Sequence, residues 1–335
     1  MGFRVVEAGF LTTVQDIGRR GYACYGFSPS GAMDQKALAL ANLLVGNSVN
    51  EAALECHQEG PVLEFTSSGA FAMTGAIVEA TLNDEPIESY RTYVHQAKDV
   101  LKIESFLKGR YAYISFAGGI KVPLFLESYS TDLDNRIGGH LGRALAVNDV
   151  LASADVYLGQ RELQVRHLEV EVPAADEVLT LRVVPWPQDQ YFTEEAYGIF
   201  YSSEYQLTEA SGREEYGLAG PFIEHQGPET IPMEGTLFGA VQIGPSGMPY
   251  VLLADRPAAN RRKNIAVVIA ADIPKLVQRM PGEKVRFQKI QVEEAQRILI
   301  DEFQSLKNND ELLYRQSRLS GGIRHTAERI ENLLT

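Results

Sequence analysis

Short apolar runs separated by turn-forming residues recur along most of the chain. They are rich in Val, Ile, Leu, Tyr and Phe, and Gly, Pro, Asn or Asp stands between them, a pattern typical of β-strands. The predicted strands cover residues 61–65, 76–83, 99–103, 110–118, 179–185, 239–244, 250–255, 265–272 and 284–290. Helical spacing of apolar residues appears at 34–45, at 194–202 and after 290. The pattern predicts a mainly β (α+β) protein with two β-rich, barrel-like halves.

A change of composition at "VEVPAADE", residues 170–177, marks the predicted boundary between the halves. This stretch is rich in Pro and acids and lacks strand patterning, and single cores usually split at this chain length. We predict an N-terminal β domain over 1–172, a second β-barrel domain over 178–290 and a helical C-terminal extension over 291–335.

A turn followed by an acid and a strand occurs three times. The segments are "AKDVLKI" (97–103), "VNDVLAS" (147–153) and "PGEKVRF" (281–287). The acid in such a turn accepts hydrogen bonds from neighbouring backbone N–H groups before the chain extends. The repeat is too short to establish a duplication, but it fits related barrels in the two halves.

The C-terminal extension has helical patterning. "VEEAQRILIDEFQSL" places Ala295, Ile298, Leu299 and Phe303 on one stripe, with charges elsewhere. We expect "NNDELL" to interrupt this helix and "GGIRHTAERIENLL" to begin a second one. Packing against the barrels is one interpretation, and contact with a further protein chain, including a homo-oligomer, is the alternative.

Charge and cysteine content narrow the class of protein. Lys and Arg total 31 against 44 Asp and Glu, a net charge of −13 that opposes binding to nucleic acid or anionic membranes. The N-terminus lacks the features of a signal peptide, and no apolar run approaches the length of a membrane span. Cys24 and Cys56 have no metal-ligand spacing and are predicted to be free and buried, which suits a reducing compartment. We expect a cytoplasmic protein without a metal site.

The polar loop at residues 11–34, "LTTVQDIGRRGYACYGFSPSGAMD", leads directly into the first predicted helix. Ser30 is the predicted N-cap of that helix and Asp34 lies in its first turn. The free N–H groups of a helix N-terminus favour anions, and Arg19 or Arg20 would add positive charge. The alternative is a purely structural loop held by hydrogen bonds among its own polar side chains, Gln15, Asp16 and Arg19.

Two further segments are candidates for a ligand site. In "STDLDNRIGGHLGRAL" (130–145), Arg136 and Arg143 flank paired glycines, although tight barrel turns explain these glycines equally well. His140 has no obvious acid–base partner nearby, so we do not assign it a catalytic role. In the second half, Gln242 and Asp255 are expected to face one mouth of a barrel.

Laid out in order, these segments resemble the KipA family, which includes the C subunits of ATP-hydrolysing 5-oxoprolinases and is also called allophanate hydrolase subunit 2. This family is related to the carboxyltransferase part of urea carboxylase. The resemblance runs collinearly from about residue 3 to residue 290. It is carried by "TTVQDIGRRGY", "SGAMDQKALALANLLVGN", "AALE", "MTGA", "AGGI", "STDL", "GGHLGRAL", "RVVPWPQDQYF", "SSEY", "GAVQI", "GMPYVLLADR" and "PGEKVRF".

The resemblance implies a cyclophilin-like barrel, at least in the second half, and work alongside a KipI-type subunit and often a LamB/YcsF-type subunit. In the oxoprolinase complex, 5-oxoproline is opened to glutamate with ATP as a co-substrate. In the carboxylase relatives, carboxybiotin passes its carboxyl group to an amide-like substrate, and any biotin here would arrive on another domain. Both reactions polarise an amide or lactam carbonyl and stabilise developing charge on its oxygen.

The patterns and the resemblance together suggest the site residues. The expected catalytic residues are Gln15, Asp16, Arg19 and Asp255. The expected substrate-binding residues are Ser30, Gly31, Asp34, Ser130, Thr131, Arg136, Arg213, Tyr216 and Gln242.

The second half departs from the family pattern in two places. Where the family reads roughly Asp-Arg-Gln-Thr-x-Gly-Gly-Tyr-Pro-Lys, this chain reads "DRPAANRRKN" (255–264), which loses a Gln, a hydroxyl and two glycines. In "GREEYGL" (212–218), Glu214 and Glu215 add negative charge that would oppose an anionic ligand.

Three functions therefore remain open. The chain is a working oxoprolinase or carboxyltransferase subunit, or an enzyme of the same architecture that acts on another amide-like substrate. The third possibility is a non-catalytic regulatory protein that binds and antagonises a KipI-type kinase inhibitor.

Overall fold

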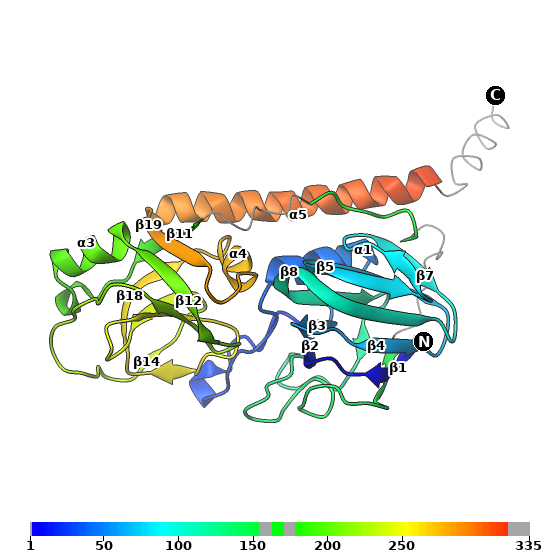
Figure 1. Cartoon of the computed structure of the whole chain (residues 1–335), viewed down its shortest axis with the longest axis horizontal. Helices are drawn as coiled ribbons and strands as arrows, with labels where there is room; N and C mark the ends of the chain where they lie inside the picture. Colours follow the sequence, from blue (N-terminus) through cyan, green and yellow to red (C-terminus); the bar gives the residue numbers. More distant parts are fainter. Residues whose placement is uncertain (1, 154–162, 171–177, 321–335) are drawn as a thin grey trace.

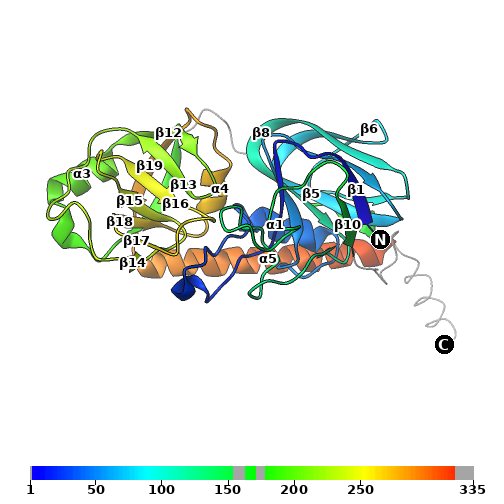
Figure 2. The same ribbon diagram turned by 90° about the horizontal axis from the view of Figure 1, so that it is seen from below.

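The computed structural model describes residues 2–153, 163–170 and 178–320, which form two β-rich halves and a long helix that lies alongside both (Figures 1 and 2). The strands of the first half are β1 (Gly2–Glu7), β2 (Leu11–Gln15), β3 (Ala53–His57), β4 (Val62–Phe65), β5 (Gly69–Leu82), β6 (Glu85–Ile87), β7 (Thr92–His95), β8 (Val100–Phe116), β9 (Ile120–Lys121) and β10 (Val150–Ser153). The strands of the second half are β11 (Leu179–Pro185), β12 (Glu204–Ser211), β13 (Glu215–Ala219), β14 (Glu234–Gly235), β15 (Ala240–Ile243), β16 (Pro249–Leu252), β17 (Ala259–Asn260), β18 (Lys263–Val268) and β19 (Lys284–Lys289). The helices are α1 (Gln35–Leu44), α3 (Glu194–Ser202), α4 (Ile273–Val277) and α5 (Val292–Ser320), with short 3-10 turns at Ala23–Tyr25 and Asp189–Tyr191.

The first half is one strongly curved sheet. Its central path runs β2-β3-β8-β4-β1-β10-β9, and the long strand β5 pairs with β6, β7 and β8. Apolar side chains from alternate positions fill its interior, including Phe3, Leu54, Phe71, Leu101 and Ile114.

The second half is a closed barrel with the strand order β11-β18-β15-β16-β13-β12-β19. Parallel pairing of β11 with β19 closes it, whereas the other pairs are antiparallel. The prediction of a mainly β fold with two barrel-like halves is therefore confirmed. Residues 171–177, where the domain boundary is predicted, lie outside the described residues.

The predicted turn repeat has the same hydrogen bond in all three copies. The carboxylates of Asp99, Asp149 and Glu283 each accept a hydrogen bond from the backbone N–H three residues earlier. The residue before each acid has a positive φ, and one of these is a glycine, Gly282. Each acid thus fixes a left-handed turn just before a strand begins.

Several local predictions are wrong for identifiable reasons. The runs at 99–103 and 110–118 form one strand, β8, because pairing with β5 continues, with shifts of register, through the residues between them. "NNDELL" does not interrupt α5, which continues to Ser320, and the second predicted tail helix lies outside the described residues. Of the two free cysteines, Cys56 is buried, but Cys24 is exposed in a loop turn.

Helix α5 packs against the first half, as the packing interpretation expected. Leu313 is fully buried in a cluster with α1, and Lys36 of α1 pairs with Glu302 at 2.6 Å. Within the described ranges, none of the helices is both long and apolar enough to cross a membrane.

Candidate functional site

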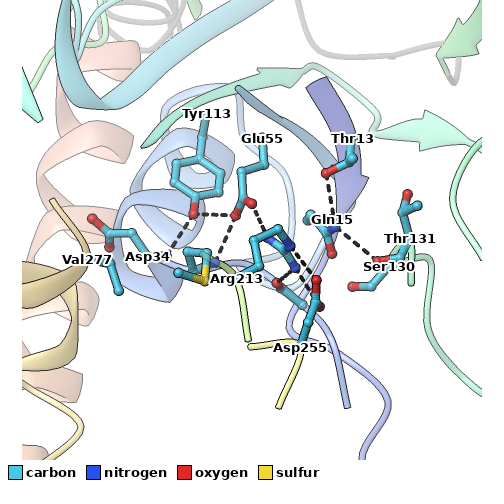
Figure 3. Close-up of polar contacts among 12 residues, drawn as sticks. Thr13, Gln15, Asp34, Glu55, Tyr113, Ser130, Thr131, Arg213, Asp255 and Val277 are labelled. Carbon is cyan, nitrogen blue, oxygen red and sulfur yellow. Dashed lines mark hydrogen bonds and ion pairs between the residues drawn. The ribbon is translucent and has the colours of Figure 1, made fainter. Parts of the chain in front are cut away.

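Several of the predicted site residues, among them Asp34, Arg213 and Asp255, gather where the two halves meet. One buried apolar cluster is shared across this seam and contains residues of α1 and β8 together with barrel residues, among them Met33, Leu38, Tyr113, Val241 and Leu253. Figure 3 shows side chains of both halves meeting there. The relative position of the halves is thus fixed by shared packing as well as by polar contacts.

Arg213 is the central cation of the seam. Its guanidinium binds both carboxylate oxygens of Asp255, at 2.7 and 3.0 Å, and reaches across the seam to Glu55 and the carbonyl oxygen of Gly31 (Figure 3). Burial alone would lower the pKa of Arg213, but Asp255 and Glu55 hold that pKa well above its ordinary value. The side chain is 6% exposed, so removing one partner would leave a buried charge uncompensated.

The N-terminus of α1 is closed by the protein's own acids. Asp34, rather than the predicted Ser30, is the N-cap and accepts from the N–H of Ala37 at 2.8 Å. Glu55 accepts from the N–H of Met33, and the Tyr113 hydroxyl accepts from the N–H of Asp34 and donates to Glu55. Carboxylate and phenol oxygens thus accept from the N–H groups of Met33, Asp34 and Ala37, which leaves fewer N–H groups for an anion than the sequence suggested.

Gln278 joins the second half to the first with every polar atom of its amide. Its Oε1 accepts from the N–H groups of Arg110 and Tyr111, and its Nε2 donates to Asp34 and to the Tyr111 carbonyl. Gly109 has a φ of +90°, and a Cβ there would lie 2.7 Å from Gln278 Oε1. A glycine is therefore required where this amide docks.

The side chain of Arg19 is buried between its own glycine-rich loop, residues 11–34, and the glycine-rich segment 130–145. It is 1% exposed, and its Nη2 donates to the carbonyl oxygen of Ser130. A Cβ at Gly138 would collide with the Arg19 guanidinium. Burial lowers the pKa of Arg19, an effect opposed by Asp132, Asp16 and Asp255. Gly138 thus makes room for a buried arginine, whereas its neighbour Gly139 makes room for the side chain of Thr131.

Asp16 holds the segment that receives Arg19. Its carboxylate accepts from the N–H groups of Gly18 and Tyr129 and from the hydroxyls of Ser128 and Ser130. Asp16 therefore fixes the loop through the 128–130 segment, whereas the structural alternative had expected Gln15, Asp16 and Arg19 to hydrogen-bond one another.

Some polar atoms of this loop are buried and have no hydrogen-bond partner among the described residues. They are Gln15 Oε1, Arg19 Nε, Arg19 Nη1 and Ser30 Oγ. The amide nitrogen of Gln15 is anchored to Thr13 and the Thr131 carbonyl, so its oxygen is held in a fixed orientation. Buried polar atoms are rarely left unpaired, so an acceptor and two donors here indicate a ligand or ordered water.

The two departures from the family pattern compensate each other. Glu215 pairs with Arg262 at 2.5 Å, so the added acid does not stand alone as the sequence suggested. Burial and the neighbouring Glu215 raise the pKa of Glu214. At the other end of the altered stretch, Asn260 and Asn264 hydrogen-bond the amide of Gln242.

Three predicted residues are not part of the group of unpartnered atoms at Gln15, Arg19 and Ser30. Tyr216 is fully buried, and its hydroxyl donates to the Val277 carbonyl, so this hydroxyl is used in a structural hydrogen bond of the core. Arg136 is exposed on its loop. Gln242 is occupied by the amide cluster described above. His140, left without a role, has a partner after all, since its Nε2 lies 3.4 Å from Asp149.

Sequence reasoning missed Glu55, Tyr113 and Gln278. Of these three, only Glu55 could have been found from the sequence. It is the single acid inside the apolar strand "ALECH", and a buried carboxylate requires a partner. No group of three or more His, Cys, Asp or Glu side chains that could hold a metal ion occurs in the described part of the chain.

Comparison with known proteins agrees with this architecture. Residues 25–289 match the family model of the carboxyltransferase domain, subdomains A and B. The chain is 34% identical to the C subunit of 5-oxoprolinase from Haemophilus influenzae over 88% of its length and 93% of the relative, and 34% identical to that from Escherichia coli over 87% and 92%. The crystal structure of K. lactis urea amidolyase superposes with a TM-score of 0.83 at 29% identity, covering 92% of this chain and 20% of the amidolyase.

The chain therefore belongs to the carboxyltransferase domain family. Within that family, its similarity to the C subunits of 5-oxoprolinase extends over nearly the whole length of those relatives.

Proposed function

We propose that this chain is the C-type subunit of an ATP-dependent 5-oxoprolinase complex and that its seam binds the lactam substrate. The 34% identity to the C subunits of two 5-oxoprolinases supports this assignment. The complex would include a KipI-type and a LamB/YcsF-type subunit and would work in the cytoplasm, where two cysteines without a disulfide are stable.

The observation that carries the proposal is the set of free polar atoms at Gln15 and Arg19. Arg19 offers two N–H donors and Gln15 offers one carbonyl acceptor, all without partners among the described residues. Both side chains are anchored to consecutive residues, Arg19 to Ser130 and Gln15 to Thr131. A lactam carries a carbonyl acceptor beside an N–H donor, which is the complementary pattern.

In the proposed mechanism, Arg19 polarises the lactam carbonyl and stabilises the charge that develops on its oxygen. Gln15 accepts from the lactam N–H and orients the ring. Asp16 holds the Ser130 segment, and Asp255 fixes Arg213 while it balances the charge of Arg19. ATP is assigned to the complex as a co-substrate, and biotin takes part only if another domain supplies it.

The first experiment is reconstitution. This chain is purified with its KipI-type and LamB/YcsF-type partners, and glutamate formation from 5-oxoproline and ATP is followed with the chain present and then omitted. Turnover that requires the chain is the expected result. A stable complex with the KipI-type partner but no turnover would overturn the proposal and leave the regulatory function.

The second experiment tests Arg19 against its neighbour. Arg19→Ala should lower kcat/KM by about 100-fold or more, the usual loss when a buried oxyanion donor is removed. Arg20→Ala is the matched control, because Arg20 is exposed beside it, and this variant should keep wild-type turnover. Circular dichroism and thermal unfolding confirm that both variants fold. Undiminished turnover by a folded Arg19→Ala variant would show that the loop is structural.

A further inference from the structure

A second group of polar side chains lies along the same seam, beside the contacts of Arg213. Arg110 of β8 is 2% exposed. Its Nη2 donates to the Ser211 carbonyl at 3.1 Å and lies 3.3 Å from His57 Nε2. Its guanidinium stacks over Tyr216, 5.0 Å from the ring centroid. Arg110 thus connects the first half, through β3 and β8, to the end of β12 in the second half.

The charge of Arg110 is not neutralised within the described structure. No carboxylate of the described residues lies within ion-pair distance of it, and the carboxylates of Glu55 and Asp255 at the seam are both paired with Arg213. His57 brings no negative charge, and burial, Arg110 and Arg213 lower its pKa to about 4. The Tyr216 ring offsets part of the desolvation cost of the cation, but a full buried charge normally requires a counter-charge.

The same place also has unused hydrogen-bonding capacity. Arg110 Nε, Arg110 Nη1 and the Ser211 hydroxyl are buried and have no partner among the described residues. Arg110 and Ser211 come from different halves, and each is more than nine-tenths buried. A positive charge, unsatisfied N–H groups and a hydroxyl together form a binding site for an anion, whereas water would satisfy the donors without balancing the charge.

We propose that Arg110 and Ser211 hold a small anion, of the size of a halide or bicarbonate, between the two halves of the protein. The site differs from the lactam site at Gln15 and Arg19 and does not depend on the proposed activity. Because the anion contacts both halves, its binding favours the docked arrangement of the seam. The depth of burial of Arg110 and Ser211 limits the ligand to a small ion.

The test begins with crystals of the full chain soaked in sodium bromide. An anomalous difference peak in contact with Arg110 and the Ser211 hydroxyl is the expected result. In solution, the melting temperature is followed while bromide, bicarbonate or phosphate replaces gluconate at constant ionic strength. Bromide or bicarbonate should give a saturable rise of about 3 °C or more, as expected for a ligand at many times its dissociation constant. A response to bromide identifies a halide site, and a response to bicarbonate alone identifies an oxyanion site.

Substitutions test whether the anion-dependent rise in melting temperature depends on Arg110 and Ser211. Arg110→Gln should abolish the saturable rise, and Ser211→Ala should weaken anion affinity about tenfold while leaving the seam folded. Arg4→Gln removes an arginine that is paired with Glu64 at the surface, and it should respond as the wild type does. The absence of a saturable rise with both bromide and bicarbonate, or a rise that is linear in anion concentration and equal in all variants, would overturn the proposal.

Discussion

At the residue scale, the hydrogen bonds that Asp34 accepts favour its ionised carboxylate, whereas its burial disfavours that charge. Asp34 caps α1 and accepts from Gln278 of the other half, yet it is buried, and burial raises the pKa of its carboxyl to about 6. The folded protein thus keeps this proton to a higher pH than the unfolded chain does. The resulting stabilisation is present at acid pH below the ordinary aspartate pKa and is lost as the pH rises through about 6.

Asp34→Asn should remove this pH dependence, because an amide keeps the capping oxygen but does not ionise. Relative to the wild type, the free energy of unfolding of the variant should rise by up to about 3 kcal/mol between pH 4 and pH 7. Urea unfolding at several pH values measures it. Asp310→Asn, at an exposed position on α5, is the control and should show no relative change. Parallel profiles for all three proteins would contradict the shifted pKa.

At the element scale, α5 offers a matched pair of neighbouring leucines. Leu313 is fully buried against the first half, whereas Leu312 is 46% exposed. Leu313→Ala should lower the free energy of unfolding by about 2–4 kcal/mol through the cavity that it leaves, and Leu312→Ala by less than about 1 kcal/mol. Urea denaturation of both variants provides the measurement. Equal small effects would show that α5 is not anchored through Leu313.

Elements with strong local patterns were predictable, and contacts between distant elements were not. The predicted bounds of the helix at 194–202 and the strand at 179–185 match α3 and β11, because periodicity and turn residues are local signals. The loop ahead of α1 was identified by its polar density, although the capping residue was misplaced. The Glu55–Arg213 pair could not be predicted, because its two residues are separated by 158 positions and no local sequence pattern links them. The partners of Gln278 are hidden for the same reason.

At the scale of the whole molecule, Gln278 is the polar contact that most directly joins the halves. Gln278→Ala should remove four hydrogen bonds and lower the free energy of unfolding by about 2–4 kcal/mol. Differential scanning calorimetry should show a lower and broader transition as the halves unfold less cooperatively. Gln206→Ala is the control, since Gln206 bonds Gly282 within the second half alone, and it should keep a sharp transition. Equal effects of the two substitutions would argue against a special role for the seam.

The long separation between Glu55 and Arg213 also has a consequence for biosynthesis. Chains are made from the N-terminus at about 5–20 residues per second, so Glu55 leaves the ribosome roughly 8 to 30 s before its partner exists. Until the second half and then α5 follow, the seam face of the first half presents Met33, Leu38 and an uncompensated acid to solvent. We expect a nascent or prematurely ended chain to be recognised by chaperones at this face.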